Sequence, residues 1–332
     1  MNRRWIASAL AVALATSALL GVGGCAKKAS APATDGTAIE ATPEPIRIGV
    51  LPTEDSLPLW VAEQQGLFQK AGIDVKIVTF QAAQERDAAF ASGSIDAYMG
   101  DIIASAMLEA GGSPVSLVTV MLGATPQQGR FGIVAKPGSK ATKLTDLAGV
   151  PIGTSSASIQ EYVVDKLMAS AGVEADQVKK EIVPKVPVRL ELLMSGKLEA
   201  AALPEPLLSL AEKQGAVLIA DDTKGENLTQ TVLGVSDKYL AVPGGMVTVG
   251  RLLDVWDEAV DVVNANPGAW RALLVDKARL PEPIKDTYVV NEYPKAQAPS
   301  EQMVTPVLEW MRAKGLLKTE LGYSDLVQEI PR

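Results

Sequence analysis

The sequence predicts an α/β protein whose folded part consists of two lobes. Short apolar or alternating segments of strand length alternate with segments that place apolar residues on one helical face. This alternation occurs in two successive sets, and the 332-residue chain is long enough for two lobes of ordinary domain size. Strands that alternate with helices are typical of parallel sheets, so we expect two α/β lobes with parallel sheets.

The first set is bounded by residues that stop strands and helices. Pro52 ends the first apolar strand, and Gly66 and Gly93 end the helices that follow. Strands are expected at residues 46–51, 73–80, 95–99 and 115–122, with helices at 57–65, at 84–91 and after Asp101.

The second set continues in the same way and leads into a helical C-terminus. Strands are expected at residues 131–135, 150–153, 180–184, 198–203 and 217–220, with helices from 159, at 188–194 and at 207–214. From Val247 on we expect helices only. The apolar stripe that predicts the first of them consists of Leu252, Val255, Trp256, Ala259 and Val263.

The N-terminus carries an export signal. Two arginines are followed by an apolar stretch and by Val22-Gly23-Gly24, directly before Cys25, the only cysteine of the chain. This resembles a lipobox, which predicts a signal peptide at 1–24 and a diacylglycerol on Cys25. Residues 25–45 lack apolar periodicity and are expected to form a flexible tether. The alternative is an uncleaved transmembrane helix, since about 18 apolar residues are near the lower limit for spanning a bilayer.

Composition excludes several classes of function. The net charge of -8 argues against a nucleic-acid partner. The chain contains no histidine, which excludes Ser-His-Asp and Cys-His catalysis and every zinc site that needs histidine. No phosphate-binding, dinucleotide-binding or EF-hand motif is present. We therefore expect no cofactor and no metal, and a monomer that binds a small molecule.

Acidic residues follow three of the predicted strands. Ligands of open α/β sheets bind beyond the carboxyl ends of strands. Glu54 and Asp55 follow the first strand, Asp101 follows the third, and Glu205 follows the strand at 198–203. Each of these residues alone can have only a structural role, because an acidic side chain near the start of a helix interacts favourably with the helix dipole. If they converge on one cleft, they favour an amine-bearing or heterocyclic ligand and disfavour a simple oxyanion.

Hydroxyl and basic residues suggest the opposite ligand charge. Ser155 and Ser156 begin a helix whose N-terminus could bind an anion, although serines there are ordinary caps. Arg130 could clamp a carboxylate or sulfonate, or it could be a surface residue or an interlobe ion pair.

Four segments resemble one known family. The stretch "LPLWVAEQQGLFQKAGIDVKIV", then "AASGSIDAYMGD", "KLTDLAGVPIG" and "LMSGKLEAAALPEP", are similar to signatures of the SsuA/THI5-like (NMT1-like) solute-binding proteins of ABC importers. The resemblance covers roughly residues 46–240. It implies a type II periplasmic-binding-protein-like fold, with two lobes joined by two crossing strands and a helical C-terminus packed on the first lobe.

The resemblance also implies a domain division and a function. We expect lobe 1 at 46–128 and 236–332 and lobe 2 at 129–235, with crossings near 125–131 and 231–236. The implied function is a lipid-anchored extracytoplasmic protein that delivers a small organic nutrient to an ABC permease and is not an enzyme. Three alternatives remain open at this point: an alkanesulfonate or organic-anion binder, a signalling subunit, and a THI5-like pyrimidine-synthesis enzyme. The enzyme would consume a histidine that this chain does not have.

Overall fold

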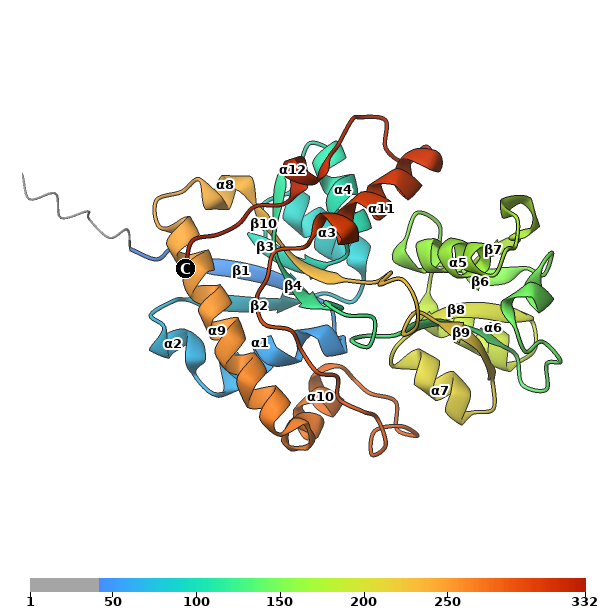
Figure 1. Cartoon of the computed structure of the whole chain (residues 1–332). Coiled ribbons are helices and arrows are strands. Elements are labelled where there is room, and N and C mark those ends of the chain that lie inside the picture. The colour runs from blue at the N-terminus through green and yellow to red at the C-terminus, as the bar shows by residue number, and fades with distance from the viewer. Residues whose placement is uncertain (1–41) are drawn as a thin grey trace, which may run out of the picture. The chain divides into compact units, whose positions relative to one another are not determined.

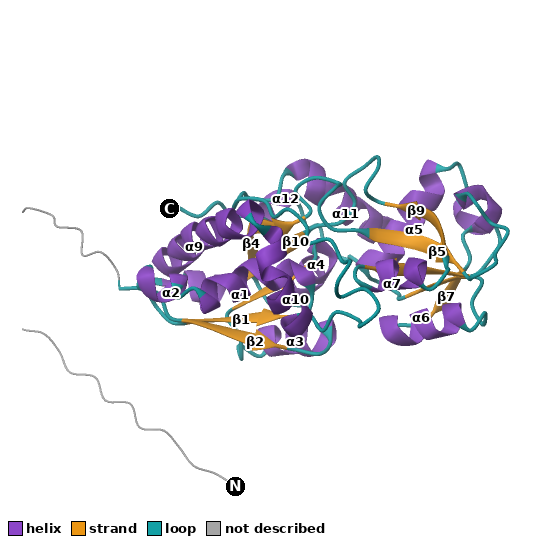
Figure 2. Cartoon of the chain, turned by 90° about the horizontal axis from the view of Figure 1, so that it is seen from below, coloured by secondary structure: helices purple, strands orange, loops and turns teal. Residues whose placement is uncertain are grey.

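A computed structural model describes residues 42–332, which contain two five-stranded sheets flanked by helices (Figures 1 and 2). The predicted signal peptide, Cys25 and most of the predicted tether lie outside the described residues. Among the described helices, none has the length and apolar character needed to cross a membrane.

The first sheet has the strand order β2-β1-β3-β10-β4. β1 is parallel to β2 and β3, whereas β10 is antiparallel to β3 and β4. The strands are β1 (Ile46–Val50), β2 (Val75–Thr79), β3 (Ala97–Gly100), β4 (Val115–Leu122) and β10 (Thr231–Ser236). The helices between the first four strands are α1 (Leu57–Gln64), α2 (Leu67–Lys70), α3 (Ala83–Ala91) and α4 (Ile102–Ala110).

The second sheet repeats this plan, with the order β7-β6-β8-β5-β9. Its parallel strands are β6, β7 and β8, and β5 is antiparallel to β8 and β9. The strands are β5 (Phe131–Ala135), β6 (Ile152–Thr154), β7 (Lys180–Ile182), β8 (Ala200–Pro204) and β9 (Val217–Asp221), and the helices are α5 (Ile159–Ser170), α6 (Val186–Met194) and α7 (Leu207–Lys213). Short 3-10 helices lie at Glu54–Ser56, Leu144–Leu147, Ala175–Gln177 and Pro267–Trp270.

These sheets confirm the two predicted α/β lobes and correct two details. The sheets are mixed, because β5 and β10, which carry the chain into each lobe, insert antiparallel beside β8 and β3. The second crossing also lies earlier than expected. Thr231–Ser236 is already a strand of the first sheet, so the chain returns within residues 222–230. The two crossings contact each other, since the side-chain amide of Asn227 donates to the Gly123 carbonyl over 2.7 Å.

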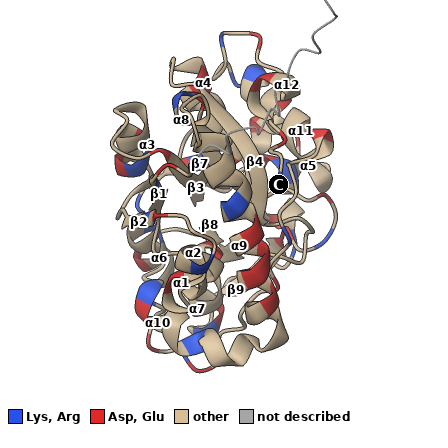
Figure 3. Ribbon diagram, turned by 90° about the vertical axis from the view of Figure 1, so that its left-hand side faces the viewer, with Lys and Arg blue, Asp and Glu red and all other residues tan. Residues whose placement is uncertain are grey.

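The C-terminal region packs mainly on the first lobe. It contains α8 (Asp237–Leu240), α9 (Gly245–Ala265), α10 (Arg271–Lys277), α11 (Glu301–Ala313) and α12 (Tyr323–Leu326). The predicted apolar stripe of α9 is buried against α1 and α2. Acidic residues recur along the same helix, as the red segments of its ribbon show (Figure 3), and several of them are exposed. Two of them, Asp254 and Asp257, pair with Arg332.

The expectation of helices only after Val247 was wrong for one long segment. Residues 278–299, between α10 and α11, form turns and extended chain without a regular helix. Four prolines at positions 281, 283, 294 and 299 explain this, since proline removes a backbone donor and restricts the residue before it. This segment lies near the second lobe and forms one wall of the site.

Candidate functional site

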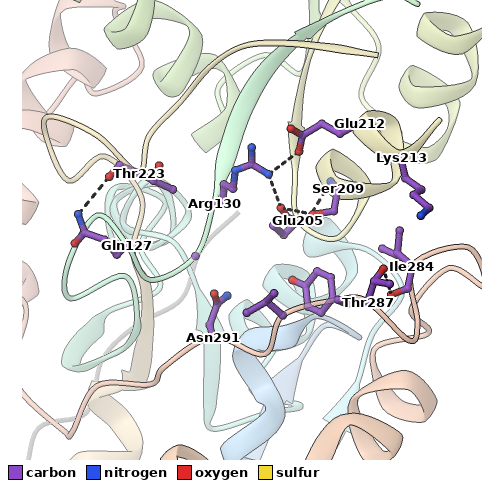
Figure 4. A pocket seen from close by; sticks show the side chains of 13 residues that line it. Gln127, Arg130, Glu205, Ser209, Glu212, Lys213, Thr223, Ile284, Thr287 and Asn291 are labelled. Carbon is purple, nitrogen blue, oxygen red and sulfur yellow. Dashed lines mark hydrogen bonds and ion pairs between the residues drawn. The ribbon is translucent and has the colours of Figure 1, made fainter. Parts of the chain in front are cut away.

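A cavity of about 470 Å³ lies between the second lobe and the segment 278–299. Figure 4 shows Arg130, Glu205 and Glu212 on one side of it, and Asn291, Thr287 and Ile284 opposite. The lining residues that carry charge or hydrogen-bonding side chains are Gln127, Arg130, Glu205, Ser209, Glu212, Lys213, Thr223, Thr287, Tyr288 and Asn291. The cavity has the size of a site for a small organic molecule.

Arg130 is surrounded by carboxylates. Its Nε lies 2.7 Å from Oδ2 of Asp221, and its Nη1 lies 2.7 Å from Oε2 of Glu212 and 3.2 Å from Oε1 of Glu205. Burial alone would lower the pKa of Arg130, but its hydrogen bonds to Glu212 and Asp221 raise it. Because the guanidinium already serves three carboxylates, it is poorly placed to clamp an anionic ligand. Arg130 forms ion pairs, but all three partners belong to its own lobe, so these are not the interlobe ion pair that was the alternative expectation.

Glu205 lies at the carboxyl end of β8 and lines the cavity. Its side chain is only 7% exposed and accepts a hydrogen bond from Ser209 Oγ over 2.8 Å. Burial raises its pKa, while Ser209 and Arg130 act in the opposite direction. The carboxyl group is therefore held by the protein and still faces the cavity.

Glu54 lies behind the opposite wall, in the connection from β1 to α1. It is 6% exposed, and its carboxylate accepts a hydrogen bond from the Tyr288 hydroxyl, while its carbonyl accepts one from Tyr293 over 2.7 Å. The pKa of Glu54 is raised to about 8, mainly by burial and to a smaller extent by the charge of Glu205, while the hydrogen bond from Tyr288 acts in the opposite direction. Glu54 and Glu205 therefore interact electrostatically across the site, although they belong to different lobes.

Asp55 contacts the start of β10, directly after the second crossing, and does not line the cavity. Its carboxylate accepts hydrogen bonds from Thr53 Oγ1 over 2.7 Å and from Thr231 Oγ1 over 2.9 Å. Thr231 is the first residue of β10, so Asp55 ties the β1–α1 connection to the strand that returns from the second lobe. Asp55 thus has a structural role in joining these two segments.

Asp101 caps α4. Its Oδ1 accepts the backbone N–H of Ala104 over 2.8 Å, and burial raises its pKa. It does not line the cavity, and the charge of Arg86 of α3 acts on it and lowers its pKa against the effect of burial. The structure therefore brings Glu54 and Glu205 together but leaves Asp101 outside this group.

Ser155 and Ser156 lie at the end of β6, also outside the cavity. Ser155 Oγ donates to the Gln160 side chain over 2.6 Å, and Ser156 is exposed. The N-terminus of α5 has its own carboxylate, because Glu161 accepts the N–H of Ala157 over 2.7 Å. Ser158, not Ser155 or Ser156, is the N-cap. These contacts argue against the hypothesis that the N-terminus of α5 alone binds an anion.

Tyr288 and Asn291 were not predicted from the sequence. Hydrogen bonds from both act on Glu54. They are more than 230 residues away in the chain and lie in the segment that was expected to be helical. The four prolines of this segment were the available signal. They indicate an irregular wall, but not which side chains of that wall face Glu54.

Comparisons with known proteins agree with this architecture. The family model described as NMT1/THI5 like matches residues 53–269. The periplasmic aliphatic sulphonate binding protein SsuA from Escherichia coli superposes with a TM-score of 0.73 at 19% identity, covering 87% of this chain and 94% of that chain. No curated protein sequence matches significantly.

Two further structures show the range of proteins with this fold. The alkanesulfonate-binding protein SsuA from Xanthomonas axonopodis pv. citri bound to MOPS has a TM-score of 0.71 at 21% identity, covering 87% of this chain and 99% of that chain. The desulfurization enzyme DSZB has a TM-score of 0.65 at 16% identity, covering 86% of this chain and 96% of that chain. At such identities the likeness establishes the fold alone.

Together these findings define a protein with the fold of periplasmic solute-binding proteins. The chain belongs to the NMT1/THI5-like family.

Proposed function

We propose that this protein is a lipid-anchored extracytoplasmic solute-binding protein of an ABC importer. Its solute is a small organic nutrient with an amine or a heterocyclic nitrogen, including zwitterionic compounds. The observation that carries the solute class is the position of Glu205 in the lining of one cavity of about 470 Å³, with Glu54 hydrogen-bonded behind Tyr288 of the opposite wall. Fold and family support the transport role by analogy with relatives whose printed names describe binding proteins.

The charge of the site supports a cationic group on the ligand. Three carboxylates, those of Glu205, Glu212 and Asp221, pair with the guanidinium of Arg130, and the buried carboxyl group of Glu54 lies behind the opposite wall. The lining contains one further cation, Lys213. Burial is the main cause of the raised pKa of Glu54, and the charge of Glu205 adds to it. A cation near both groups would offset the contribution of Glu205 and favour the ionised form of Glu54. A simple oxyanion in the same place would add to that repulsion.

Native mass spectrometry of gently purified protein should identify the solute, which calorimetry can then measure against variants. Glu205→Gln should weaken binding by about 2 to 5 kcal/mol, because the ligand cation loses a buried partner. The control is Glu199→Gln, which removes an exposed carboxylate of the same lobe, whose side chain is 54% exposed and pairs with Lys136. Equal affinity of wild type and Glu205→Gln would contradict the acidic site.

An alkanesulfonate or other organic anion is the second candidate. It is supported by the printed names of SsuA relatives and by a buried arginine, Arg189, whose side chain approaches Ser155 to 3.5 Å. A copurified solute without a cationic nitrogen would favour this candidate. The THI5-like enzyme is not proposed, because its chemistry needs a histidine and the chain has none.

The anchor is tested separately. Cys25→Ser should release the protein from membranes, because a diacylglycerol contributes about 0.8 kcal/mol per buried CH₂. The measurement is detergent partitioning with a labelled fatty acid. Unchanged membrane association would indicate an uncleaved apolar helix instead.

A further inference from the structure

Two buried arginines occupy equivalent places in the two lobes. Arg86 lies in α3 and Arg189 in α6, and each precedes the strand that forms the third parallel position of its sheet. They are 3% and 0% exposed. In each case the chain continues for seven residues to a glycine with φ of 74°, Gly93 or Gly196, which ends the helix region.

In each lobe, a glycine at the equivalent position of the central parallel strand packs against the arginine side chain. A Cβ added at Gly49 of β1 would lie 3.2 Å from Cγ of Arg86, and one added at Gly153 of β6 would lie 3.3 Å from Cγ of Arg189. Each arginine therefore crosses the central parallel strand of its lobe over a glycine and carries its guanidinium toward the carboxyl ends of the strands, where ligands of α/β sheets bind.

Arg86 has a complete set of partners. Its Nη1 donates to the carbonyl of Met99 over 2.6 Å. Its Nε and Nη2 donate to Oδ1 of Asp87 over 2.9 and 2.7 Å. The carboxylate that neutralises it comes from the next residue in the chain.

Arg189 lacks that carboxylate, because the next residue is Leu190. Its Nη1 donates to the Val183 carbonyl over 3.2 Å and approaches Ser155 Oγ at 3.5 Å. Its Nε and Nη2 have no hydrogen-bond partner among residues 42–332, and neither has the buried hydroxyl of Thr154. The unpartnered edge of Arg189 is thus the same edge that holds Asp87 beside Arg86.

A buried guanidinium without an anion is unfavourable. Buried charges in proteins are normally paired, and an unpaired edge costs the desolvation of its donors. Burial lowers the pKa of Arg189 to about 10, so the group remains charged at neutral pH. An edge with two parallel N–H donors has the geometry that carboxylate, sulfonate and phosphate groups accept in a bidentate manner.

We propose that Arg189, with Ser155, forms an oxyanion-binding site that takes the carboxylate or sulfonate of the transported solute. Ser155 and Val183 directly follow β6 and β7. β6 is the neighbour of β8, which ends at Pro204 directly before Glu205, and neighbouring strands lie about 5 Å apart. The solute is then a zwitterion, with its cation near Glu205 and its anion at Arg189. This assignment rests on the proposed function.

The test uses thermal unfolding of the mature protein with small probes at constant ionic strength. The probes are sulfate, ethanesulfonate, ethylammonium and 2-aminoethanesulfonate, each over a range of concentrations. Ethanesulfonate and 2-aminoethanesulfonate should raise the melting temperature of the wild type. Arg189→Met should weaken this response at least tenfold in apparent affinity, whereas Lys185→Met, at an exposed lysine preceding α6, should not.

The variants also separate an anion site from a structural role. Without anions, Arg189→Met should unfold at or above the wild-type temperature, because it removes an unpaired buried charge. The matched Arg86→Met should unfold lower, because it removes a paired one. If Arg189→Met unfolds too readily for titration, Ser155→Ala gives the second measurement, with a smaller loss of anion response.

The outcomes distinguish a free oxyanion from the anionic group of the solute. They also distinguish failure of the Arg189 site from failure of the proposed function. Sulfate acting as strongly as 2-aminoethanesulfonate would overturn the assignment to the solute and indicate a site for free oxyanions. The absence of any anion response that depends on Arg189 would overturn the site itself. Binding of the copurified solute that depends on Glu205 but not on Arg189 would leave the proposed function standing and this inference refuted.

Discussion

Replacing Glu54 by glutamine should remove a large part of the pH dependence of stability. Glu54 is buried, and its pKa is raised from 4.5 to about 8 in the folded protein. The folded state therefore keeps a proton that the unfolded state loses near its ordinary pKa. Stability is complete below about pH 4.5 and falls as the pH rises toward 8.

The raised pKa sets an upper limit on the effect. A shift of this size corresponds to a loss of at most about 5 kcal/mol across the window, at about 1.4 kcal/mol per pH unit. Asp222, whose pKa burial raises to about 6, contributes in the same direction only below that pH. Burial also raises the pKa values of Asp101 and Glu205. The difference between wild type and Glu54→Gln from pH 6.5 to 8 therefore isolates the contribution of Glu54.

The assay is urea unfolding of solute-free protein at several pH values. Wild type should lose stability between pH 6.5 and 8, whereas Glu54→Gln should have a nearly flat profile there and be the more stable protein at pH 8. The control is Glu258→Gln, at an exposed position of α9, which should keep the wild-type slope. A Glu54→Gln profile as steep as wild type would refute the reasoning.

Three further changes test the hinge, the pocket wall and the contact between α11 and the second lobe. Gly123→Ala places a Cβ 2.1 Å from the carbonyl oxygen of Thr229 in the second crossing. In urea unfolding it should lower the free energy of unfolding by at least about 2 kcal/mol more than Gly138→Ala, a control with a similar positive φ and open space around it. Equal losses would contradict contact between the crossings. Arg130→Gln leaves three carboxylates without their shared cation and should lower stability by about 2 kcal/mol, with a change below about 0.5 kcal/mol counting against the network. Asp165 of α5 accepts a hydrogen bond from the indole N–H of Trp310 in α11 over 2.9 Å. Asp165→Ala removes this contact and should increase the radius of gyration of solute-free protein in X-ray scattering. An unchanged radius would show that the contact does not hold the lobes together.

Local patterns predicted most elements but not the direction of two strands. Pro52 and Gly66 mark real boundaries, and β4 and β5 begin and end where the alternation predicts. Periodicity cannot tell a parallel from an antiparallel neighbour, because both place alternate side chains on the same face. The antiparallel insertion of β5 and β10 depends on where the chain crosses between lobes, which no local pattern contains.

The position of residues beside the cavity was predictable where strand ends determine it. Glu54 and Glu205 follow strands, and the rule about carboxyl ends places both near the site. The same rule also selected Asp101 and Asp55, because it cannot distinguish a cap or a crossover contact from a cavity wall. Tyr288 reaches Glu54 from a segment more than 230 residues away, and only the tertiary fold reveals this.

A crystal structure with the copurified solute tests the central claim most directly. We predict density in the cavity between Glu205 and the segment 278–299, with a nitrogen of the solute within about 3 Å of the Glu54 or Glu205 carboxylate. A solute bound away from both carboxylates, or one without a nitrogen facing them, would contradict the account.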